Sequence, residues 1–369
     1  MKETELYIGV MSGTSMDGVD CALVAIDADQ VSLLGHHFTP MPNALKQQLL
    51  SVCLNQATNI ETIGRLDHQL GHLFADAVLE LLEKTHTPTD RVTAIGNHGQ
   101  TLFHQPDGPT PFSVQLGDAN IIAAKTNITT IADFRRKDIA LGGQGAPLVP
   151  AFHRAIFSAS EASVVVLNIG GIANISVLRP NQAVIGYDTG PGNMLMDAWI
   201  ETKQGKKYDH NGEFALSGTV SEALLQQLLN DPYFALPAPK STGRELFNLA
   251  WLQTHLSHFS LSDADVQATL AEFSAQTITN EVIKYQCGLT PQLMVCGGGA
   301  CNPVLMRRLA EKLPDWHVTT TSDKGVDSDY MEAMAFAWLA YRRHHALPSN
   351  LPEVTGASRL ASLGVVYPA

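Results

Sequence analysis

The fold of this chain is decided by the stretch YIGVMSGTSMDGVDCALVAID, residues 7–27, in which two apolar runs flank the turn SGTSMDG. A two-residue turn such as Asn-Gly would close a hairpin with fewer residues. Glycine allows the backbone to direct its N–H groups at an anion, and Thr14 and Ser15 add hydroxyl donors. The turn Ser12–Gly18 is therefore a candidate phosphate-binding hairpin, with a plain long hairpin turn as the structural alternative.

A second hairpin opens the other half of the chain with VVVLNIGGIANISVL, residues 164–178. It repeats the plan of the first: a strand, a glycine-centred turn and a strand. This is an internal duplication of architecture rather than of residue identity. Two similar lobes, each presenting a glycine turn, predict a ligand held in the cleft between them, and the paired turns favour nucleotide phosphates.

A third glycine element is VCGGGACNP, residues 295–303, where an apolar strand runs into three glycines and then a helix. The glycines permit a ring or ribose to approach the backbone closely, and the N-terminus of the helix favours negative charge. Tight strand-to-helix turns often need glycine for structural reasons alone. Together with the two hairpins, however, the element predicts an adenosine site. The residues expected to contact the nucleotide are Ser12, Gly13, Thr14, Ser15, Met16, Asp17, Gly18, Val19, Asn168, Gly170, Gly171, Asn174, Gly297, Gly298, Gly299 and Asn302.

Short apolar runs alternate with longer amphipathic ones along the chain, which is typical of an α/β fold. The longest predicted helix, Ile60–Lys84, carries its apolar residues at a clear 3.6 period. We expect strands at Leu6–Met11, Cys21–Ile26, Val92–Gly96, Phe112–Leu116, Ile128–Ala132, Ser163–Ile169, Ile172–Leu178, Ala183–Tyr187 and Pro291–Cys296. Further helices are predicted at Ser221–Leu229, Ala264–Tyr285, Pro303–Lys312 and Tyr330–Arg343.

The predicted domain organisation is two lobes, residues 1–130 with the first hairpin and residues 131–345 with the second hairpin and the adenosine motif. The glycine-rich segment Gly142–Pro150 is the expected hinge or crossing loop. The C-terminal segment 346–369 is loop-like and carries a late apolar GVVY. We expect it to return and pack on the first lobe.

Composition and charge restrict the class of protein. The 369 residues are 45% hydrophobic and 16% charged, which is ordinary for a globular protein. A net charge of −12 argues against nucleic acid or an anionic membrane as the partner. Five cysteines without a CxxC pair favour reduced thiols over a disulfide framework or a zinc site. The start MKETELYIGV is unlike a signal peptide, and no apolar run approaches the ~20 residues of a membrane span, so we expect a cytoplasmic protein.

Motifs spread over nearly the full length connect the chain with a known family. They are MSGTSMDGVD (residues 11–20), GNHGQTLFHQP (96–106), DFRRKDIALGGQGAPLVP (133–150), NIGGIANIS (168–176), GYDTGPGN (186–193) and EAMAFAWLA (332–340). With these motifs the chain resembles the anhydro-N-acetylmuramic acid kinases, within the acetate and sugar kinase, heat-shock chaperone and actin superfamily. The resemblance implies two lobes of ribonuclease-H-like fold, each a mixed sheet flanked by helices, with an interlobe cleft.

The resemblance also implies a reaction. ATP would phosphorylate O6 of 1,6-anhydro-N-acetylmuramic acid while water opens the anhydro ring, giving N-acetylmuramate 6-phosphate and ADP, in peptidoglycan recycling and amino-sugar catabolism. It further implies Mg²⁺ and a homodimer. In the wider superfamily an aspartate two residues before the hairpin glycine lies near the magnesium, but here Met11 and Asn168 stand at the two corresponding places. Neither supplies a carboxylate, so we expect Mg²⁺ to be held by phosphates and water, with at most one nearby acid such as Asp17.

The predicted catalytic base is Asp188 in GYDTGPGN. It follows a predicted strand and precedes a glycine-proline turn, so its carboxylate can project from a rigid edge into the cleft. The alternative is an Asx-turn or helix-cap aspartate, which is common before glycine. The resemblance favours Asp188 as the base that deprotonates water for attack at the anomeric carbon; phosphoryl transfer then needs mainly positioning and charge neutralisation.

Three residues are expected to hold the sugar. His98 lies at the end of the predicted strand Val92–Gly96, where a histidine bonded to the backbone is the alternative. Arg135 suits the lactyl carboxylate, because guanidinium binds carboxylates bidentately; Arg136 could do the same, and one of the two is expected to be a surface ion-pair partner. Glu332 opens an otherwise apolar helix, where it either contacts a ligand hydroxyl or faces the helix dipole.

Parts of the sequence also suggest other functions. A metal hydrolase is suggested by His68 and His72 at the i,i+4 spacing of zinc ligands, but both fall opposite the apolar face of the predicted helix and no Glu follows His68. A non-metabolic ATPase of the same superfamily is disfavoured because no substrate-binding domain is appended. A kinase for another sugar or anhydro-sugar stays open, since the residues by themselves do not select a muramyl ligand.

Overall fold

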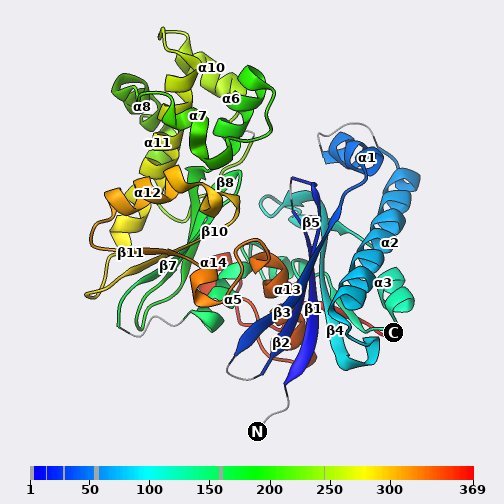
Figure 1. Cartoon of the computed structure of the whole chain (residues 1–369). Helices are drawn as coiled ribbons and strands as arrows, with labels where there is room; N and C mark the ends of the chain where they lie inside the picture. Colours follow the sequence, from blue (N-terminus) through cyan, green and yellow to red (C-terminus); the bar gives the residue numbers. More distant parts are fainter. Residues whose placement is uncertain (1–3, 14, 28–29, 54–57, 158–160, 245) are drawn as a thin grey trace. The chain divides into compact units, whose positions relative to one another are not determined.

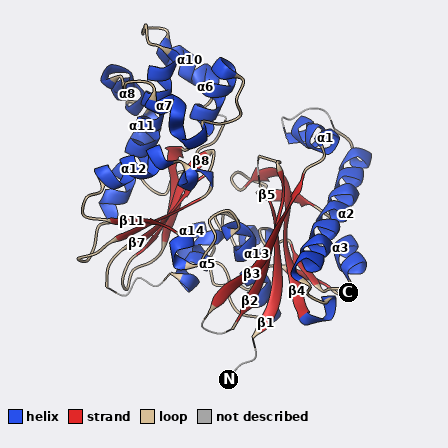
Figure 2. Ribbon diagram, viewed as in Figure 1, coloured by secondary structure: helices blue, strands red, loops and turns tan. Residues whose placement is uncertain are grey.

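The computed structural model describes residues 4–13, 15–27, 30–53, 58–157, 161–244 and 246–369 (Figure 1). The chain divides into two compact units, Met1–Ile156 with Tyr330–Ala369, and Phe157–Asp329. We call them the first unit and the second unit. Each is built around one mixed sheet flanked by helices (Figure 2).

The sheet of the first unit contains β1 (Glu5–Ser12), β2 (Gly18–Ile26), β3 (Val31–Pro40), β4 (Val92–Gln105), β5 (Phe112–Leu116), β6 (Thr130–Ala132) and β12 (Val365–Tyr367). Its strand order is β12-β6-β4-β1-β2-β3, with β5 paired to β4. β2 runs antiparallel to β1 and to β3, whereas β4 runs parallel to both β1 and β6. The first predicted hairpin, β1 and β2, thus lies at the centre of this sheet.

The sheet of the second unit contains β7 (Val164–Ile169), β8 (Ile172–Leu178), β9 (Ile185–Pro191), β10 (Gln292–Cys296) and β11 (His317–Thr320) in the order β11-β10-β7-β8-β9. β8 is antiparallel to β7 and β9, and β10 is parallel to β7 and β11. Order and directions therefore repeat those of β6-β4-β1-β2-β3 in the first unit. This confirms the predicted α/β fold and the internal duplication inferred from the two hairpins.

Helices cover both faces of the first sheet. They are α1 (Asn43–Cys53), α2 (Ile60–Thr85), α3 (Ala119–Thr126), α4 (Arg136–Ala140), α5 (Val149–Ile156), α13 (Met331–His344) and α14 (Pro352–Thr355). α2 packs on β2 and β3, and α13 packs on β1 and β4. Because side chains alternate along a strand, Ile8 and Val10 of β1 join the apolar core under α2, whereas Gly9 meets α13.

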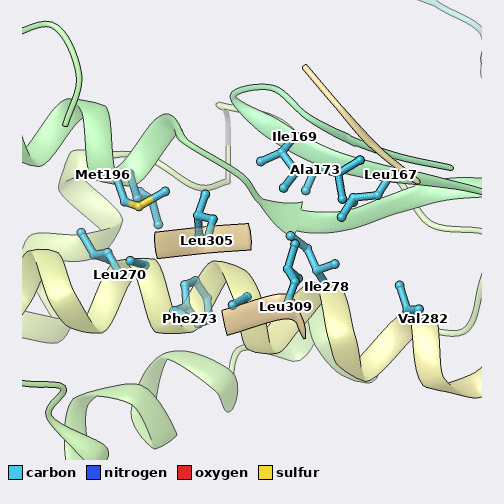
Figure 3. Close-up of a cluster of buried hydrophobic side chains, with 14 of the residues drawn as sticks. Leu167, Ile169, Ala173, Met196, Leu270, Phe273, Ile278, Val282, Leu305 and Leu309 are labelled. Atoms are coloured by element: carbon cyan, nitrogen blue, oxygen red, sulfur yellow. The ribbon is translucent and has the colours of Figure 1, made fainter. Parts of the chain in front are cut away.

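The core of the second unit lies between its sheet and α11 (Asp263–Val282). Figure 3 shows Leu270, Phe273 and Ile278 of α11 in one apolar cluster with Leu167 and Ile169 of β7. The other helices of this unit are α6 (Met194–Gln204), α7 (Glu213–Leu216), α8 (Glu222–Leu229), α9 (Pro232–Ala235), α10 (Leu249–Leu256) and α12 (Pro303–Lys312). α11 is buried on nearly every side, which explains why its sequence lacks a polar stripe.

The unit boundaries differ from those expected at residues 130 and 345. β6 pairs with β4, and α13 packs on β1 and β4, so both belong to the first unit. The segment Gly142–Pro150 also lies inside the first unit, and the chain passes between units after Ile156 and after Asp329. β12 pairs with β6, which places the C-terminal segment on the first unit as expected.

Several strands extend beyond their predicted ends. β4 continues to Gln105, so His98 lies inside the strand and not at its end. β9 continues to Pro191, so Asp188 also lies within a strand and not after it. β3 was not predicted. It is an edge strand whose side chains are half-buried or exposed, so it shows no clear apolar face.

The structure also bears on the functions that the sequence excludes. His68 and His72 are exposed on the outer face of α2, away from its core, which agrees with the rejection of a catalytic zinc site. None of the five cysteines, all within the described residues, forms a disulfide. Among the described helices, none has the length and apolarity that a membrane crossing would require.

Candidate active site

The turn between β1 and β2 is braced by a side chain from β4. Ser12 Oγ lies 2.7 Å from Gln100 Oε1 and 3.0 Å from the main-chain oxygen of Gly18. Gln100 Nε2 donates to the main-chain oxygen of Gly13 at 3.3 Å. Both Ser12 and Gln100 are buried. Gln100 was missed by the sequence analysis, although it stands inside the quoted motif GNHGQTLFHQP.

The remaining residues predicted in this turn have different surroundings. Ser15 is exposed, whereas the side chains of Met16 and Val19 are buried in the core. The Asp17 carboxylate is exposed and pairs with Lys46 at 2.7 Å. A Cβ on Gly18 would lie 2.4 Å from the Phe38 ring, so glycine is needed there for packing. Thr14 lies outside the described residues.

His98 and Arg135 are brought together in the first unit. Arg135 Nη2 and Nε lie 2.8 and 3.2 Å from His98 Nε2, and Arg135 Nη1 donates to the main-chain oxygen of Gly145 at 2.8 Å. Because guanidinium can only donate, Nε2 of His98 is the acceptor and Nδ1 carries the proton, which it donates to the main-chain oxygen of Gly99 at 2.7 Å. His98 is thus hydrogen-bonded both to the backbone and to Arg135, which is itself predicted to bind the substrate.

The protonation states of this pair follow from its burial. Burial, and then the Arg135 charge, lowers the pKa of His98 to about 3, so the imidazole is neutral at physiological pH. Burial also lowers the pKa of Arg135 to about 10, which still leaves it charged. The site therefore offers one fixed positive charge held by a neutral acceptor.

Glu332 and Arg136 complete the predicted sugar-binding set. Glu332 lies in the first turn of α13, and its side chain reaches solvent. The surrounding protein raises the pKa of its carboxyl, an effect that the nearby Arg135 charge opposes. Arg136 points outward and pairs with Asp133. Of the two adjacent arginines, Arg135 is therefore the one placed beside His98 and Glu332.

A buried carboxylate that the sequence analysis missed supports Arg135. Asp138 is fully buried, and its Oδ2 accepts the N–H of Gly145 at 2.9 Å. Its Oδ1 accepts from Asn350 and Thr355 at 3.0 and 2.9 Å. Asp138 thus fixes Gly145, whose carbonyl receives Arg135, and ties that loop to the C-terminal segment. The three groups that donate to the Asp138 carboxylate are a main-chain N–H, an amide and a hydroxyl.

In the second unit, the two predicted glycine elements converge on one place. A Cβ on Gly297 would lie 2.3 Å from Asn168 Oδ1, and one on Gly299 would lie 2.3 Å from Ile169 Cγ2. The turn at Gly170 and Gly171 is held from the other side by main-chain hydrogen bonds from residues 192–194. The hairpin and the GGG turn thus pack without room for a side chain at Gly297 and Gly299, whereas a Cβ on Gly170, Gly171 or Gly298 would meet nothing closer than 3.5 Å.

A row of polar residues crosses the second sheet at this place. Asn168 of β7 stands opposite Asn174 of β8, which stands opposite Asp188 of β9. Residues paired in this way share one face of a sheet. Their neighbours Ile169, Ile175 and Tyr187 belong to the core under α11, so the polar row lies on the opposite face. The three predicted residues are thereby brought together.

Asp188 is held by a segment that the sequence analysis did not single out. Asp188 Oδ2 accepts from Ser241 Oγ at 3.0 Å and from the Thr242 N–H at 3.1 Å. The motif PKSTG around these residues carried no periodic or spacing signal that would mark it. The arrangement can present one half-buried carboxylate in a fixed orientation on an edge strand, which suits a general base.

Asn302 and the expected magnesium ion fit the nucleotide prediction less directly. Asn302 Oδ1 caps α12 by accepting the N–H groups of Val304 and Leu305, so its carbonyl already has a structural use. Among the described residues, the one cluster of three His, Cys, Asp or Glu ligands is Glu5 with His344 and His345, none of them a predicted nucleotide contact. Within the described ranges, the predicted nucleotide contacts thus include no three-ligand cluster.

Comparison with known proteins decides which family has this arrangement. The sequence profile of the family described as anhydro-N-acetylmuramic acid kinase matches residues 5–369. Proteins of that name from Vibrio parahaemolyticus and Vibrio cholerae are 68% and 64% identical over 367 residues, which is 100% of this chain and 99% of each relative. One from Pasteurella multocida is 57% identical over 370 residues, covering 100% of this chain and 98% of the relative.

This chain belongs to the anhydro-N-acetylmuramic acid kinase family. The match runs through both units, so it includes Arg135 and Glu332 of the first and Asp188 of the second. The family resemblance inferred from the quoted motifs is thereby confirmed.

The buried imidazole of this anhydro-N-acetylmuramic acid kinase family member should leave a signature in its stability. The pKa of His98 falls from its ordinary 6.5 to about 3 on folding. As pH falls below 6.5, the unfolded chain binds this proton first, so stability is full above that pH and is lost toward pH 3. Between pH 7 and 5 the loss from His98 alone amounts to about 2 kcal/mol.

We expect His98→Asn to lower the free energy of unfolding at pH 7 but to flatten its fall toward pH 5 by about that amount. Urea unfolding at the two pH values measures this. His153, which is buried with its pKa also lowered to about 3, is present in both proteins and cancels. The matched control is His72→Asn on the exposed face of α2, which should keep the wild-type slope. An unchanged slope in His98→Asn would contradict the buried neutral imidazole.

Proposed function

We propose that this chain is an ATP-dependent sugar kinase that phosphorylates O6 of 1,6-anhydro-N-acetylmuramic acid and opens the anhydro ring with water in the same reaction. The products are N-acetylmuramate 6-phosphate and ADP. The observation that carries the proposal is the match of one kinase family over residues 5–369. The convergence of Asn168, Asn174 and Asp188 on one face of the second sheet adds support from the chain's own geometry.

In this proposal Asp188 is the general base. Its carboxylate takes a proton from water, whose oxygen attacks C1 of the sugar. The C1–O6 bond breaks, and O6 leaves as the alkoxide that attacks the γ-phosphorus of ATP. ADP departs, and the proton on Asp188 is returned to solvent. One base suffices because bond cleavage at C1 creates the nucleophile for phosphoryl transfer, which otherwise needs positioning and charge neutralisation.

The sugar would be held by the first unit. Arg135 carries the positive charge that suits the lactyl carboxylate of the muramic acid, and His98 holds the guanidinium by accepting from it at 2.8 Å. Glu332, whose side chain reaches solvent beside Arg135, would accept a hydrogen bond from a sugar hydroxyl. A main-chain contact to the sugar would come from the loop that Asp138 fixes at Gly145.

Elements of both units would contact the nucleotide. We propose that the turn Ser12–Gly18 and the turn Asn168–Ser176 bind its phosphates, with the GGG turn at residues 297–299 beside the adenosine. Mg²⁺ bound with the phosphates would neutralise charge on the transferring phosphoryl group. The exposed Asp17 is disfavoured as its ligand, because it pairs with Lys46. A cytoplasmic homodimer that acts in peptidoglycan recycling and amino-sugar metabolism completes the proposal.

The test is a turnover assay with purified protein, ATP, Mg²⁺ and the anhydro-sugar. ADP release should depend on the sugar, and oxygen from ¹⁸O-labelled water should appear in the C1 hydroxyl of the phosphorylated product. Constant ADP release without the sugar would instead indicate a non-metabolic ATPase. ADP formation without label at C1 would contradict the coupled ring opening while leaving a kinase in place.

The same assay identifies the sugar. An anhydro-sugar without the lactyl group, such as anhydro-N-acetylglucosamine, should be turned over poorly, because Arg135 would then lose its carboxylate partner while the rest of the ring is unchanged. Equal kcat/KM for the two sugars would contradict the muramyl specificity and favour the kinase for another anhydro-sugar.

A further inference from the structure

The backbone at Asp188 lies on an edge strand, and a second segment of the same unit replaces the missing neighbour. Asp188 N–H donates to the main-chain oxygen of Lys240 at 3.0 Å, and Tyr233 Oη donates to the main-chain oxygen of Asp188 at 2.7 Å. Ser241 Oγ and the Thr242 N–H donate to Asp188 Oδ2. The segment Tyr233–Thr242 thus satisfies both main-chain groups and one side-chain oxygen of the proposed base.

This segment is anchored by a buried ion pair. Lys240 Nζ lies 2.9 Å from Glu281 Oε1 of α11, and the two side chains are only 3% and 5% exposed. Lys240 Nζ also lies 3.4 Å from the main-chain oxygens of Tyr233 and Phe234 and 4.9 Å from the centre of the Tyr233 ring. The ammonium therefore closes the segment on itself as well as fastening it to the helix.

The surroundings of Glu281 favour the charged form of its carboxyl group, which suits an ion pair with Lys240. Burial alone would raise the pKa of its carboxyl, but hydrogen bonds from Lys284, Lys240 and Tyr187 lower it below the ordinary value. The Tyr187 hydroxyl lies 2.9 Å from Glu281 Oε2, and Tyr187 is the residue before Asp188 in β9. The strand that carries the base is thus connected to α11 on its core face and to Tyr233–Thr242 at its edge.

A buried ion pair is rarely the most stable way to fill a core, since an apolar pair of similar volume often does as well or better. It does fix geometry, because a buried charge has few acceptable positions. Here the fixed position determines where Lys240 O, Ser241 Oγ and the Thr242 N–H stand around Asp188. That makes orientation of the carboxylate, rather than stability alone, the effect that this arrangement explains best.

We propose that Ser241 and the Thr242 N–H orient the carboxylate of Asp188 for water activation, and that the Lys240–Glu281 pair holds them in place. This inference rests on the proposed function, in which Asp188 is the base. Ser241 and Lys240 are positioning residues, because they act through Asp188 and not on the substrate. A carboxylate held by fewer donors samples other rotamers, and a base misplaced by about 1 Å loses much of its rate advantage.

The first test is Ser241→Ala, which removes one donor to Asp188 Oδ2 and nothing else that the structure records. We expect kcat to fall about tenfold, the loss of one hydrogen bond to a charged group, with both KM values within about twofold of wild type and the same thermal midpoint. Ser241→Thr keeps the hydroxyl and should restore most of kcat. The matched control is Ser257→Ala, an exposed serine whose hydroxyl donates to the main-chain oxygen of Thr254, which should leave kcat unchanged.

Wild-type kcat in Ser241→Ala, or no rescue by Ser241→Thr, would overturn the inference. The second variant is Lys240→Met, which removes the anchor; it should lower kcat as well, and a folded Lys240→Met with wild-type kcat would also count against the inference. Should Lys240→Met fail to fold, the serine variants carry the test alone.

Asp188→Asn, measured beside them, separates the two proposals. Retained turnover in that variant would show that Asp188 is not the base, and the inference about its orientation would fail with it. An inactive Asp188→Asn beside a fully active Ser241→Ala would overturn only the orienting role.

Discussion

Asp188→Asn should lower kcat by at least about a thousandfold, which is the upper part of the range that general-base catalysis contributes. Asparagine has the shape of aspartate, and its side-chain oxygen can still accept from Ser241 and the Thr242 N–H. The local fold is therefore expected to survive. What the amide cannot do is take a proton from water, so the attack on C1 that would start the reaction fails.

Binding and chemistry must be measured separately to read this variant. Calorimetric titration with the anhydro-sugar and with a non-hydrolysable ATP analogue should give dissociation constants within about threefold of wild type, since neither ligand loses more than one contact. Single-turnover formation of ADP reports the chemical step. A useful control is Asp263→Asn at the start of α11, where an exposed carboxylate pairs with Lys203 at 2.9 Å and which should keep wild-type kcat.

Turnover within tenfold of wild type in Asp188→Asn would remove Asp188 from the role of base. Loss of both binding and turnover would also count against it, because it would assign the carboxylate to ligand binding rather than to proton transfer. Only selective loss of the chemical step agrees with the proposed mechanism.

The sequence was sufficient to predict the fold because its signals are local. Each hairpin is a strand, a glycine turn and a strand within about twenty residues, and the apolar face of α2 repeats at the helical period over its whole length. The predicted ends of several strands were wrong. Gly190 and Pro191 argue against a strand, yet β9 continues through them because it is an edge strand and needs partners on one side only.

The predicted boundary between the units differs from the observed one for a related reason. Residues 131–156 and 330–345 join the first unit, the former through pairing of β6 with β4 and the latter through packing of α13 on β1, a contact between the two ends of the chain. Composition offers no sign of such contacts, because both segments are ordinary mixed sequence. The glycine-rich run after Ala140 resembles a hinge, but two of its glycines are needed for packing: a Cβ on Gly143 would lie 2.3 Å from Asp138 Oδ2, and one on Gly145 would lie 2.9 Å from Ile139 Cγ1.

For the candidate site, motif residues could be found but their partners could not. Ser12 and Gln100 are 88 residues apart, and Asp188 and Ser241 are 53 apart. Nothing in the spacing of Gln100, Asp138, Lys240 or Ser241 marks them, since their use depends on which strands become neighbours. The motifs therefore name the candidate residues, whereas the side chains that contact and orient those residues are seen only in the structure.

The second large effect is expected where β1 and β4 meet α13. Gly9 and Gly96 stand opposite each other in neighbouring strands. A Cβ on Gly9 would lie 1.7 Å from the main-chain oxygen of Ala333, and one on Gly96 would lie 2.0 Å from that of Phe336. The backbones of the helix and the strands are thus in direct contact. The atoms that an added methyl group would meet first are main-chain atoms of α13, so no side-chain rotation can make room for it.

Gly9→Ala should therefore destabilise the protein by about 3 kcal/mol or more, the upper range for overpacking of a core. Activity should fall as well, because displacement of α13 moves Glu332 and also Phe336, whose ring centre lies 4.7 Å from that of His98. Urea unfolding gives the stability, and KM for the sugar reports the site.

The matched control is Gly64→Ala on the exposed face of α2, where a Cβ meets nothing within 4 Å. Alanine there should stabilise the helix by about 0.5–1 kcal/mol. Gly9 lies in a strand and Gly64 in a helix, but neither has a positive φ that would demand glycine. Opposite signs of the effect would therefore show that the backbone contact at Gly9 sets the cost. A Gly9→Ala variant within about 1 kcal/mol of wild type would mean that α13 can withdraw from the sheet freely, and Glu332 could then not be held in a fixed position beside Arg135.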